Sequence, residues 1–240
     1  MMKKYILIIK KKINTKEKEI LDLPELTKKL SSLHEKLILK YGNWKDEYEE
    51  QILSVNYIKP NNCVLELGGN IGRNSMIISL LLDDPKKLVV IEPSKNIYNQ
   101  LIENKNNNNL LFNSECCAIS ERKLWSSKWN TYTEYKPGTV EIDTMSFEEV
   151  KNKYNYRFDT LVCDCEGALY YILQDNEKIL HDIETIIIEN DFTDIKHKEY
   201  VDNIFKKYNL SCVYQKEGDS YVKTYLPCKQ NFYEVWKRYL

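Results

Sequence analysis

Short apolar runs alternate with longer amphipathic stretches over most of this chain. Runs of strand length lie at Val64–Leu67, Leu88–Ile91, Leu110–Phe112 with Cys116–Ile119, Thr160–Asp164 and Thr185–Glu189. The stretches that follow them predict helices at Arg73–Leu82, Ser94–Asn104, Ser146–Tyr154, Ala168–Leu180 and Asp194–Tyr208. Strands that alternate with helices in this way are typical of βαβ units, so the pattern predicts an α/β fold with a mostly parallel sheet.

The N-terminal part of the chain has a different pattern, because leucines recur there at helical spacing from Leu21 to Leu37. We predict helices over residues 15–58, interrupted at Tyr41-Gly42-Asn43, with Pro24 in a first turn after Asp22. The chain is therefore divided into an N-terminal helical extension, residues 1–58, and a main domain, residues 59–240.

The C-terminal part predicts an edge feature of the sheet. Leu210–Gln215 and Ser220–Tyr225 flank the turn-like segment Lys216-Glu217-Gly218-Asp219, which indicates a terminal antiparallel hairpin. Phe232, Tyr233 and Trp236 follow at helical spacing and are predicted as core residues. The asparagine-rich tract of residues 104–109 is interpreted as a solvated loop.

Composition indicates a soluble globular protein, with 42% hydrophobic and 30% charged residues in 240. The formal net charge of −1 gives no field that would attract nucleic acid, so no nucleic-acid partner is expected. The run Tyr5–Ile9 is too short for a signal peptide and no run could span a bilayer; we expect a cytoplasmic protein. The seven cysteines include no C-x-x-C pair, which favours reduced thiols, and His34, His181 and His197 are expected at the surface.

The most informative segment is Cys63–Gly72, CVLELGGNIG, in which a strand-like run ends in a glycine-rich loop before a helix. Strand, glycine turn and helix form the geometry in which a backbone can approach an adenosine-containing ligand closely. We expect Gly68 and Gly72 to leave room for such a ligand, and Asn70 to tolerate a left-handed backbone. A purely structural tight turn is the alternative.

Acidic residues lie where the predicted strands end, at Glu66, Glu92, Asp164 and Glu189. The carboxyl ends of parallel strands meet at one rim, so these side chains are candidates for a single site. Glu92 lies 20 residues beyond Gly72, close to the spacing at which an acid meets the ribose hydroxyls of a nucleotide. The alternative is a solvated polar residue at a strand end.

The form of the glycine loop indicates which nucleoside would bind. Counted from Gly68, the dinucleotide fingerprint G-x-G-x-x-G would require glycine where this chain has Asn70 and Arg73. The Gly-Lys-Ser/Thr sequence of a phosphate-binding loop is also absent. A loop without these phosphate features suits a ligand without a pyrophosphate, and S-adenosylmethionine is the obvious candidate.

The chain resembles FkbM-type methyltransferases, which are class I enzymes that use S-adenosylmethionine, over roughly residues 50–235. The resemblance is carried by four segments in order: VLELGGNIG, VVIEPS at Val89–Ser94, FDTLVCDCEGA at Phe158–Ala168, and TIIIEND at Thr185–Asp191. It implies a Rossmann-like fold with a seven-stranded sheet whose last strand is antiparallel. The chain departs from the family at Leu169, where an acid is common, and ahead of Asp164, where Val162 and Cys163 leave no lysine.

The resemblance also implies roles for particular residues. Glu66, Gly68, Gly69, Asn70 and Gly72 would hold the methionine part and backbone of the cofactor, Glu92 would bind the ribose, and Pro93 and Ser94 would turn beneath the adenine. Residues 114–118, with Glu115 and Cys116, would flank the adenine ring. Asp164, Glu166 and Gly167 would line the reaction centre, with Asp164 also near the cofactor.

Methyl transfer from a sulfonium is an in-line displacement, so the protein must align the reactants and, for an alcohol, remove a proton. Asp164 is the first candidate for the general base and Glu166 the second, each needing a raised pKa. A hydrogen-bonded cap at a strand-to-helix turn is the alternative role. No metal site is predicted, although such carboxylates could instead hold a divalent cation.

The aromatic residues Trp125, Trp129, Tyr132 and Tyr135 form a loop-like stretch that would suit stacking on a sugar ring, or a lid packed on the core. Together with the resemblance, they favour O-methylation of a sugar or glycan hydroxyl. The alternatives are methylation of a small natural product or a nucleic-acid ribose, or a catalytically silent module that binds a cofactor or partner.

Overall fold

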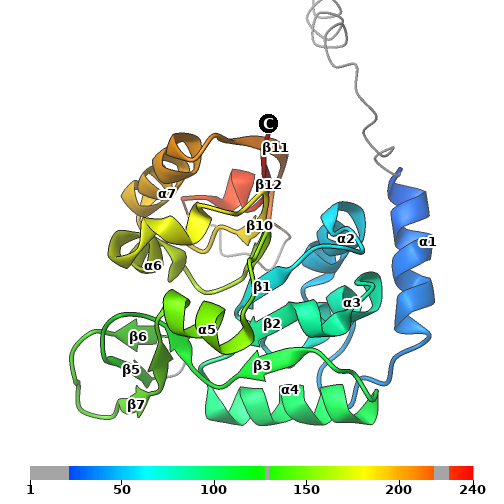
Figure 1. Cartoon of the computed structure of the whole chain (residues 1–240), viewed down its shortest axis with the longest axis horizontal. Helices are drawn as coiled ribbons and strands as arrows, with labels where there is room; N and C mark the ends of the chain where they lie inside the picture. Colours follow the sequence, from blue (N-terminus) through cyan, green and yellow to red (C-terminus); the bar gives the residue numbers. More distant parts are fainter. Residues whose placement is uncertain (1–21, 128–129, 219–226, 240) are drawn as a thin grey trace, which may run out of the picture.

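The central element of the protein is a seven-stranded sheet (Figure 1). The computed structural model describes residues 22–127, 130–218 and 227–239. The strands of the sheet are β1 (Val64–Leu67), β2 (Leu88–Ile91), β3 (Asn113–Glu115), β9 (Thr160–Cys163), β10 (Thr185–Glu189), β11 (Leu210–Lys216) and β12 (Tyr233–Arg238). Their order is β11-β12-β10-β9-β1-β2-β3. All neighbours pair in parallel except β12, which is antiparallel to both β10 and β11.

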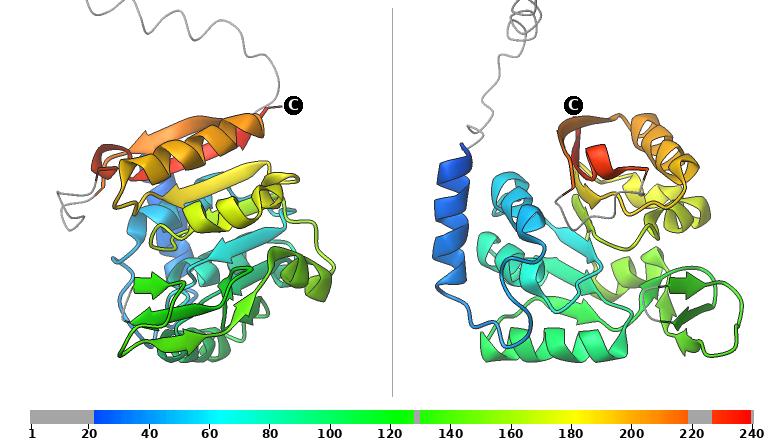
Figure 2. Two further views of the ribbon diagram at one scale, coloured as in Figure 1. Left: turned by 90° about the vertical axis from the view of Figure 1, so that its left-hand side faces the viewer. Right: turned by 180° about the vertical axis from the view of Figure 1, so that it is seen from behind.

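Helices cover both faces of this sheet (Figure 2). On one face lie α1 (Leu23–His34), α2 (Tyr48–Tyr57), α3 (Arg73–Leu81) and α4 (Lys95–Asn107). On the other lie α5 (Phe147–Tyr154), α6 (Leu169–Asp175) and α7 (Ile195–Lys207). Short 3-10 helices occur at η2 (Pro85–Lys87), η3 (Glu177–Leu180) and η4 (Lys229–Asn231).

The alternation of side chains along the strands divides the core into two layers. Leu65 and Val89 point to the layer under α5–α7, whereas Val64 and Leu88 point to the layer under α1–α4. Strands buried on both faces read as continuous apolar runs, which is why the sequence pattern located β1, β2 and β10 at their observed bounds. The predicted fold class, a mostly parallel sheet with N-terminal helices, is confirmed.

The N-terminal helices pack into the same core as the sheet. Leu30 of α1 and Leu53 of α2 are buried in the cluster that also contains Met76 of α3 and Val64 of β1. Asp22 caps α1 with Pro24 in the first turn, as predicted. His34, predicted at the surface, instead bonds Gln51 at 2.7 Å between Nε2 and Oε1 and so joins α1 to α2.

The third strand differs from its prediction. The apolar residues Leu110–Phe112 precede β3 rather than form it, and the paired residues are the polar Asn113–Glu115. β3 is the edge strand of the sheet and its side chains are half-buried, so it lacks the apolar pattern by which a strand is recognised.

The C-terminal strand also differs from its prediction. The partner of β11 is β12, which contains Tyr233 and Trp236, and these residues are core residues on a strand rather than on a helix. The segment Ser220–Tyr225, predicted as the second strand of the hairpin, lies outside the described residues. β12 occupies a place between β10 and β11, so it is buried on both faces and its alternation is masked.

Most of the asparagine tract is helical rather than a loop, since α4 continues to Asn107 and only Asn108 and Asn109 lie in the turn beyond it. Asn104 is fully buried; its Nδ2 donates to the carbonyl of Ile71 at 2.8 Å, and its Oδ1 accepts from the N–H of Lys40 at 2.9 Å. The tract therefore ties the segment after α1 to the glycine loop.

A small second sheet is inserted between β3 and α5. It consists of β5 (Leu124–Ser127), β6 (Asn130–Tyr132) and β7 (Val140–Ile142), and Figure 1 shows it projecting beside α5. Its base is closed by the pair β4 (Ala118–Ile119) and β8 (Thr144–Met145). Trp125 and Tyr132 face each other across β5 and β6. Among the described residues, no helix is long and apolar enough to span a membrane.

Candidate functional site

The glycine loop between β1 and α3 is left-handed at Asn70, as the sequence predicted, and also at Gly68 and Gly72. Gly68 has φ +89°, Asn70 +45° and Gly72 +90°. The N–H groups of Gly68 and Gly69 both donate to the carbonyl of Ile91, at 2.9 and 3.0 Å, which ties the loop to the end of β2. The loop therefore lies at the carboxyl rim of the central strands.

Gly68 is required by the packing of the protein itself, a reason that the sequence did not give. A Cβ atom on this residue would lie 1.6 Å from the carbonyl oxygen of Asp164. Because that oxygen belongs to the backbone at the end of β9, it cannot move aside without disturbing the sheet. Gly68 thus allows two strand ends to approach each other.

Glu92 is fixed beside the glycine loop. Its Oε2 accepts from the N–H of Asn70 at 3.0 Å, and its Oε1 accepts from the N–H of Ser94 at 2.8 Å. Burial, opposed by these two hydrogen bonds, raises the pKa of Glu92 to about 7. Glu92 therefore lies next to the glycine loop, as predicted. Each of its two carboxylate oxygens retains a lone pair that can accept from a further donor.

Glu66 lies below the loop rather than at its surface. Its side chain is 2% exposed and accepts hydrogen bonds from Asn74 Nδ2 at 3.2 Å and Ser75 Oγ at 2.5 Å. Burial raises its pKa to about 8. Both partners lie in the first turn of α3, so Glu66 positions the helix and the loop from inside; its contact with a cofactor stays a prediction.

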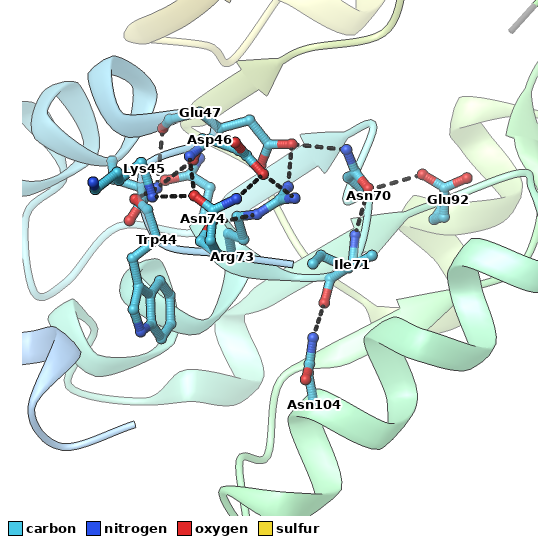
Figure 3. Close-up of polar contacts among 12 residues, drawn as sticks. Trp44, Lys45, Asp46, Glu47, Asn70, Ile71, Arg73, Asn74, Glu92 and Asn104 are labelled. Carbon is cyan, nitrogen blue, oxygen red and sulfur yellow. Dashed lines mark hydrogen bonds and ion pairs between the residues drawn. The ribbon is translucent and has the colours of Figure 1, made fainter. Parts of the chain in front are cut away.

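The segment before α2 reaches over the same loop, as Figure 3 shows. Glu47 has a left-handed φ of 56°, and its Oε1 accepts from Asn70 Nδ2 at 2.7 Å and from Arg73 Nη1 at 2.6 Å. Arg73 also bonds Asp46 Oδ2 at 3.1 Å and the carbonyl of Asn43 at 3.0 Å. The N-terminal segment is therefore part of the wall of this site.

Three carboxylates meet at the next strand ends along the rim. Asp164 follows β9, Glu189 ends β10, and Glu50 comes from α2. One oxygen from each lies within 4.8 Å of the others. Removal from water and the charges of Glu189 and Asp191 hold the pKa of Asp164 well above its usual range. Removal from water and the charges of Asp164 and Glu189 likewise raise the pKa of Glu50 well above its usual range.

Of the remaining predicted site residues, some lie at the rim and others contact different parts of the protein. Cys116 lies near Glu92. Burial, and to a smaller extent the charge of Glu92, raises the pKa of the Cys116 thiol. Glu115 is engaged instead with α5, where Tyr154 donates to it and Lys153 forms an ion pair at 2.5 Å. Glu166, two residues beyond Asp164, is exposed with φ +53°. The half-buried Pro93 leads into Ser94, the N-cap of α4.

Sequence reasoning missed Glu47 and Glu50. The charge of Glu47 helps to raise the pKa of Asp164, Glu50, Glu66 and Glu92. The charge of Asp164 helps to raise the pKa of Glu50. Both side chains therefore belong to the site electrostatically. The signal available was the acidic run in KDEYEE, residues 45–50, which breaks the apolar pattern of the extension. Without the fold, such a run reads as a solvated surface.

No protein-family model matches the chain, and no curated protein sequence matches it at significant similarity. Solved structures do resemble it. A candidate O-methyltransferase from Klebsiella pneumoniae has a TM-score of 0.51 at 12% identity, over 92% of this chain and 93% of that one. A candidate tRNA (m1A22) methyltransferase from Streptococcus pneumoniae has a TM-score of 0.50 at 12% identity, over 79% and 69%.

At such low identity the likeness concerns the fold alone. The strand order, the single antiparallel strand and the glycine loop at the rim agree with it. The chain therefore has the Rossmann-like fold of class I methyltransferases.

Proposed function

We propose that this protein is an S-adenosylmethionine-dependent methyltransferase that methylates a hydroxyl oxygen of a sugar or glycan. The observation that carries the proposal is the joining of the left-handed loop Gly68–Gly72 to the carboxylate of Glu92 through the N–H of Asn70. In an open α/β sheet, ligands bind at the carboxyl ends of the central strands, where this pair lies.

The residues at the rim fit the proposed cofactor. The ribose hydroxyls would donate to the lone pairs that Glu92 retains beyond its bonds to Asn70 and Ser94. The methionine part would lie along the glycine loop toward Asp164, whose carbonyl packs on Gly68. The cationic sulfonium would there face Asp164, Glu50 and Glu189, a region of negative potential.

Transfer to an alcohol needs a proton acceptor. Asp164 is the proposed general base, because a carboxyl with a raised pKa is a stronger base once ionised. Glu166 is the second candidate, and its side chain is exposed two residues beyond Asp164. The cofactor would supply the methyl group, while these residues orient the acceptor hydroxyl and take its proton.

The acceptor class is supported by two features. The four segments that resemble FkbM-type methyltransferases favour oxygen as the acceptor atom, with a sugar as its carrier. The inserted sheet β5–β7 presents Trp125 and Tyr132 on one hairpin, and aromatic rings suit stacking against a sugar face. The net charge of −1 disfavours a nucleic-acid acceptor.

Calorimetry with S-adenosylmethionine and with its demethylated product tests the cofactor. We expect both to bind at micromolar to sub-millimolar concentration; no binding at millimolar concentration contradicts the proposal. Asp164→Asn is then expected to lower turnover by about 100-fold or more while leaving cofactor affinity within a few-fold. Glu199→Gln, at an exposed position of α7, is the matched control. Unchanged turnover in the Asp164 variant removes it from the role of base.

A screen with methyl-labelled cofactor tests the acceptor. Monosaccharides, oligosaccharides, small phenolic alcohols and RNA are incubated with the protein, and labelled product is counted. We expect transfer to a sugar hydroxyl. Transfer only to RNA or to a phenol overturns the acceptor class, and cofactor binding without any transfer favours a catalytically silent module.

A further inference from the structure

Three carboxylates from three separate elements converge at the rim of the sheet. Glu50 comes from α2, Asp164 from the end of β9 and Glu189 from the end of β10, and one oxygen of each lies within 4.8 Å of the other two. Oxygens on opposite sides of one Mg²⁺ lie roughly 4.2 Å apart, and around one Ca²⁺ roughly 4.8 Å. The three oxygens thus lie no farther apart than the ligand shell of a single divalent cation spans, and a smaller ion would draw them closer.

Unpartnered buried oxygens provide a second, independent observation. Glu50 is only 5% exposed, its carboxylate points into the cluster, and its Oε1 has no hydrogen-bond partner. Asp191, two residues beyond Glu189, has a buried Oδ2 that also lacks a partner. Buried carboxylate oxygens are normally satisfied, because leaving one unpaired costs roughly 1–3 kcal/mol or more.

Two positive groups beside the cluster are already engaged. Arg73 pairs with Asp46 and Glu47, and Lys216 pairs with Glu49 on α2. The strongest charged influences on Asp164 are the carboxylates of Glu189, Asp191, Glu47 and Glu166. Like charges this close need either protons or a cation between them.

We propose that Glu50, Asp164 and Glu189 bind a divalent cation with hard oxygen preference, such as Mg²⁺ or Mn²⁺. Asp191, whose side chain is hydrogen-bonded to Asp164, is placed to orient that ligand. The N-terminal helix α2 then contributes a ligand to the site, and the cation fixes that helix to the ends of β9 and β10. Cation binding itself does not depend on the proposed methyl transfer. Only its use in orienting the acceptor oxygen rests on that function. In the cation-bound protein Asp164 serves as a ligand, so Glu166 is the candidate for the general base there.

Titration of the EDTA-treated full-length protein with Mn²⁺, followed by electron paramagnetic resonance, tests the site. We expect one Mn²⁺ per chain, and at least about tenfold weaker binding in Glu50→Gln and in Glu189→Gln. Glu35→Gln, an exposed carboxylate at the end of α1, is the matched control and should bind as the unmodified protein does.

Thermal unfolding gives a second readout of Mn²⁺ binding, which is needed if a substitution disturbs the fold of the variant. Mn²⁺ should raise the Tm of the unmodified protein in a concentration-dependent manner, because a ligand of the folded state stabilises it. Glu50→Gln should have an equal or higher Tm without metal, since it removes a buried like charge, yet lose the response to Mn²⁺. If Glu50 and Glu189 instead share a proton, neither uptake nor a Tm response occurs at millimolar Mn²⁺, and the proposal fails.

Binding of S-adenosylmethionine in the presence of EDTA separates this proposal from the proposed function. Cofactor binding without Mn²⁺ uptake leaves the methyltransferase proposal in place and overturns the cation site. Mn²⁺ uptake that is unaffected by Glu50→Gln overturns the contribution of α2.

Discussion

At the scale of single residues, the glycine loop is determined by close contacts within the protein as well as by any ligand. Gly68 faces the backbone of Asp164, and the Cβ of a residue in place of Gly69 would lie 2.2 Å from a methyl group of Val90. Asn70 uses its backbone to bond Glu92 and its side chain to bond Glu47. Each of these residues connects two strand ends or connects the loop to the N-terminal segment.

Gly68→Ala is expected to destabilise the fold by about 3 kcal/mol or more, because it adds a backbone clash to a left-handed conformation. Gly138→Ala is the matched control, since Gly138 has φ +86° and nothing within 4 Å of an added Cβ. That change should cost only about 1 kcal/mol, the price of the conformation alone. Urea unfolding of the two variants measures the difference; equal losses would show that the Asp164 contact has no effect.

Glu92 is expected to make stability depend on pH around neutrality. Its folded pKa of about 7 lies above the ordinary value of 4.5, so the folded state holds the proton more tightly than the unfolded state does. The stabilising effect of that proton is full below about pH 4.5 and is lost as the pH rises through about 7.

Glu92→Gln removes this titration. Urea midpoints measured from pH 5 to pH 8 should fall more steeply in the unmodified protein than in the variant. Glu66 and Asp191, each with a pKa raised to about 8, contribute in the same direction in both proteins, so the difference between the two curves isolates Glu92. Parallel curves would contradict the raised pKa of Glu92.

At the scale of elements, the sequence was most informative for strands and helices that bury a continuous apolar surface. β1, β2 and β10 were located at their bounds, and α3 and α5 within one residue, with Ser146 capping α5 through a complete capping box. The edge strand β3 and the last strand β12 were missed. The first has too little apolar surface, and the second has an apolar spacing that fits helix and strand equally well.

The candidate site likewise contains residues that the sequence pattern could place and residues that it could not. Placing Glu92 next to the glycine loop required only the rule that parallel strands end at one rim. Placing Glu47 and Glu50 required knowing where α2 packs, which depends on long-range contacts of Asn104 and Arg73 with the segment before that helix. A sequence pattern reports which face of a helix is buried, but not against which part of the chain it is buried.

At the scale of the whole molecule, the N-terminal helices and the sheet share one hydrophobic cluster. The division into an extension of residues 1–58 and a domain of residues 59–240 stays a prediction. The packing favours a single cooperative unit, since α1 lies on α2 and α3 in both views (Figures 1 and 2).

Leu30→Ala tests this cooperativity. Leu30 of α1 is fully buried, so its truncation should cost about 3 kcal/mol and shift one common unfolding transition for the whole chain. Leu23→Ala, on the same helix but 64% exposed, should change stability by less than about 0.5 kcal/mol. Urea unfolding followed by tryptophan fluorescence and by circular dichroism measures both. A separate early transition in Leu30→Ala would favour two independent units.

The sequence by itself determined the α/β class, the central strands and the position of the glycine loop, because these depend on local periodicity and on residues adjacent in the chain. Only the tertiary structure decided that Gly68 packs on Asp164, that Glu66 is buried beneath α3, and that Glu50 joins Asp164 and Glu189. The first and last of these relations join residues that are far apart in the sequence, and the second depends on how α3 folds back over β1. They arise when helices dock on a sheet, and docking is determined by the packing of the whole core.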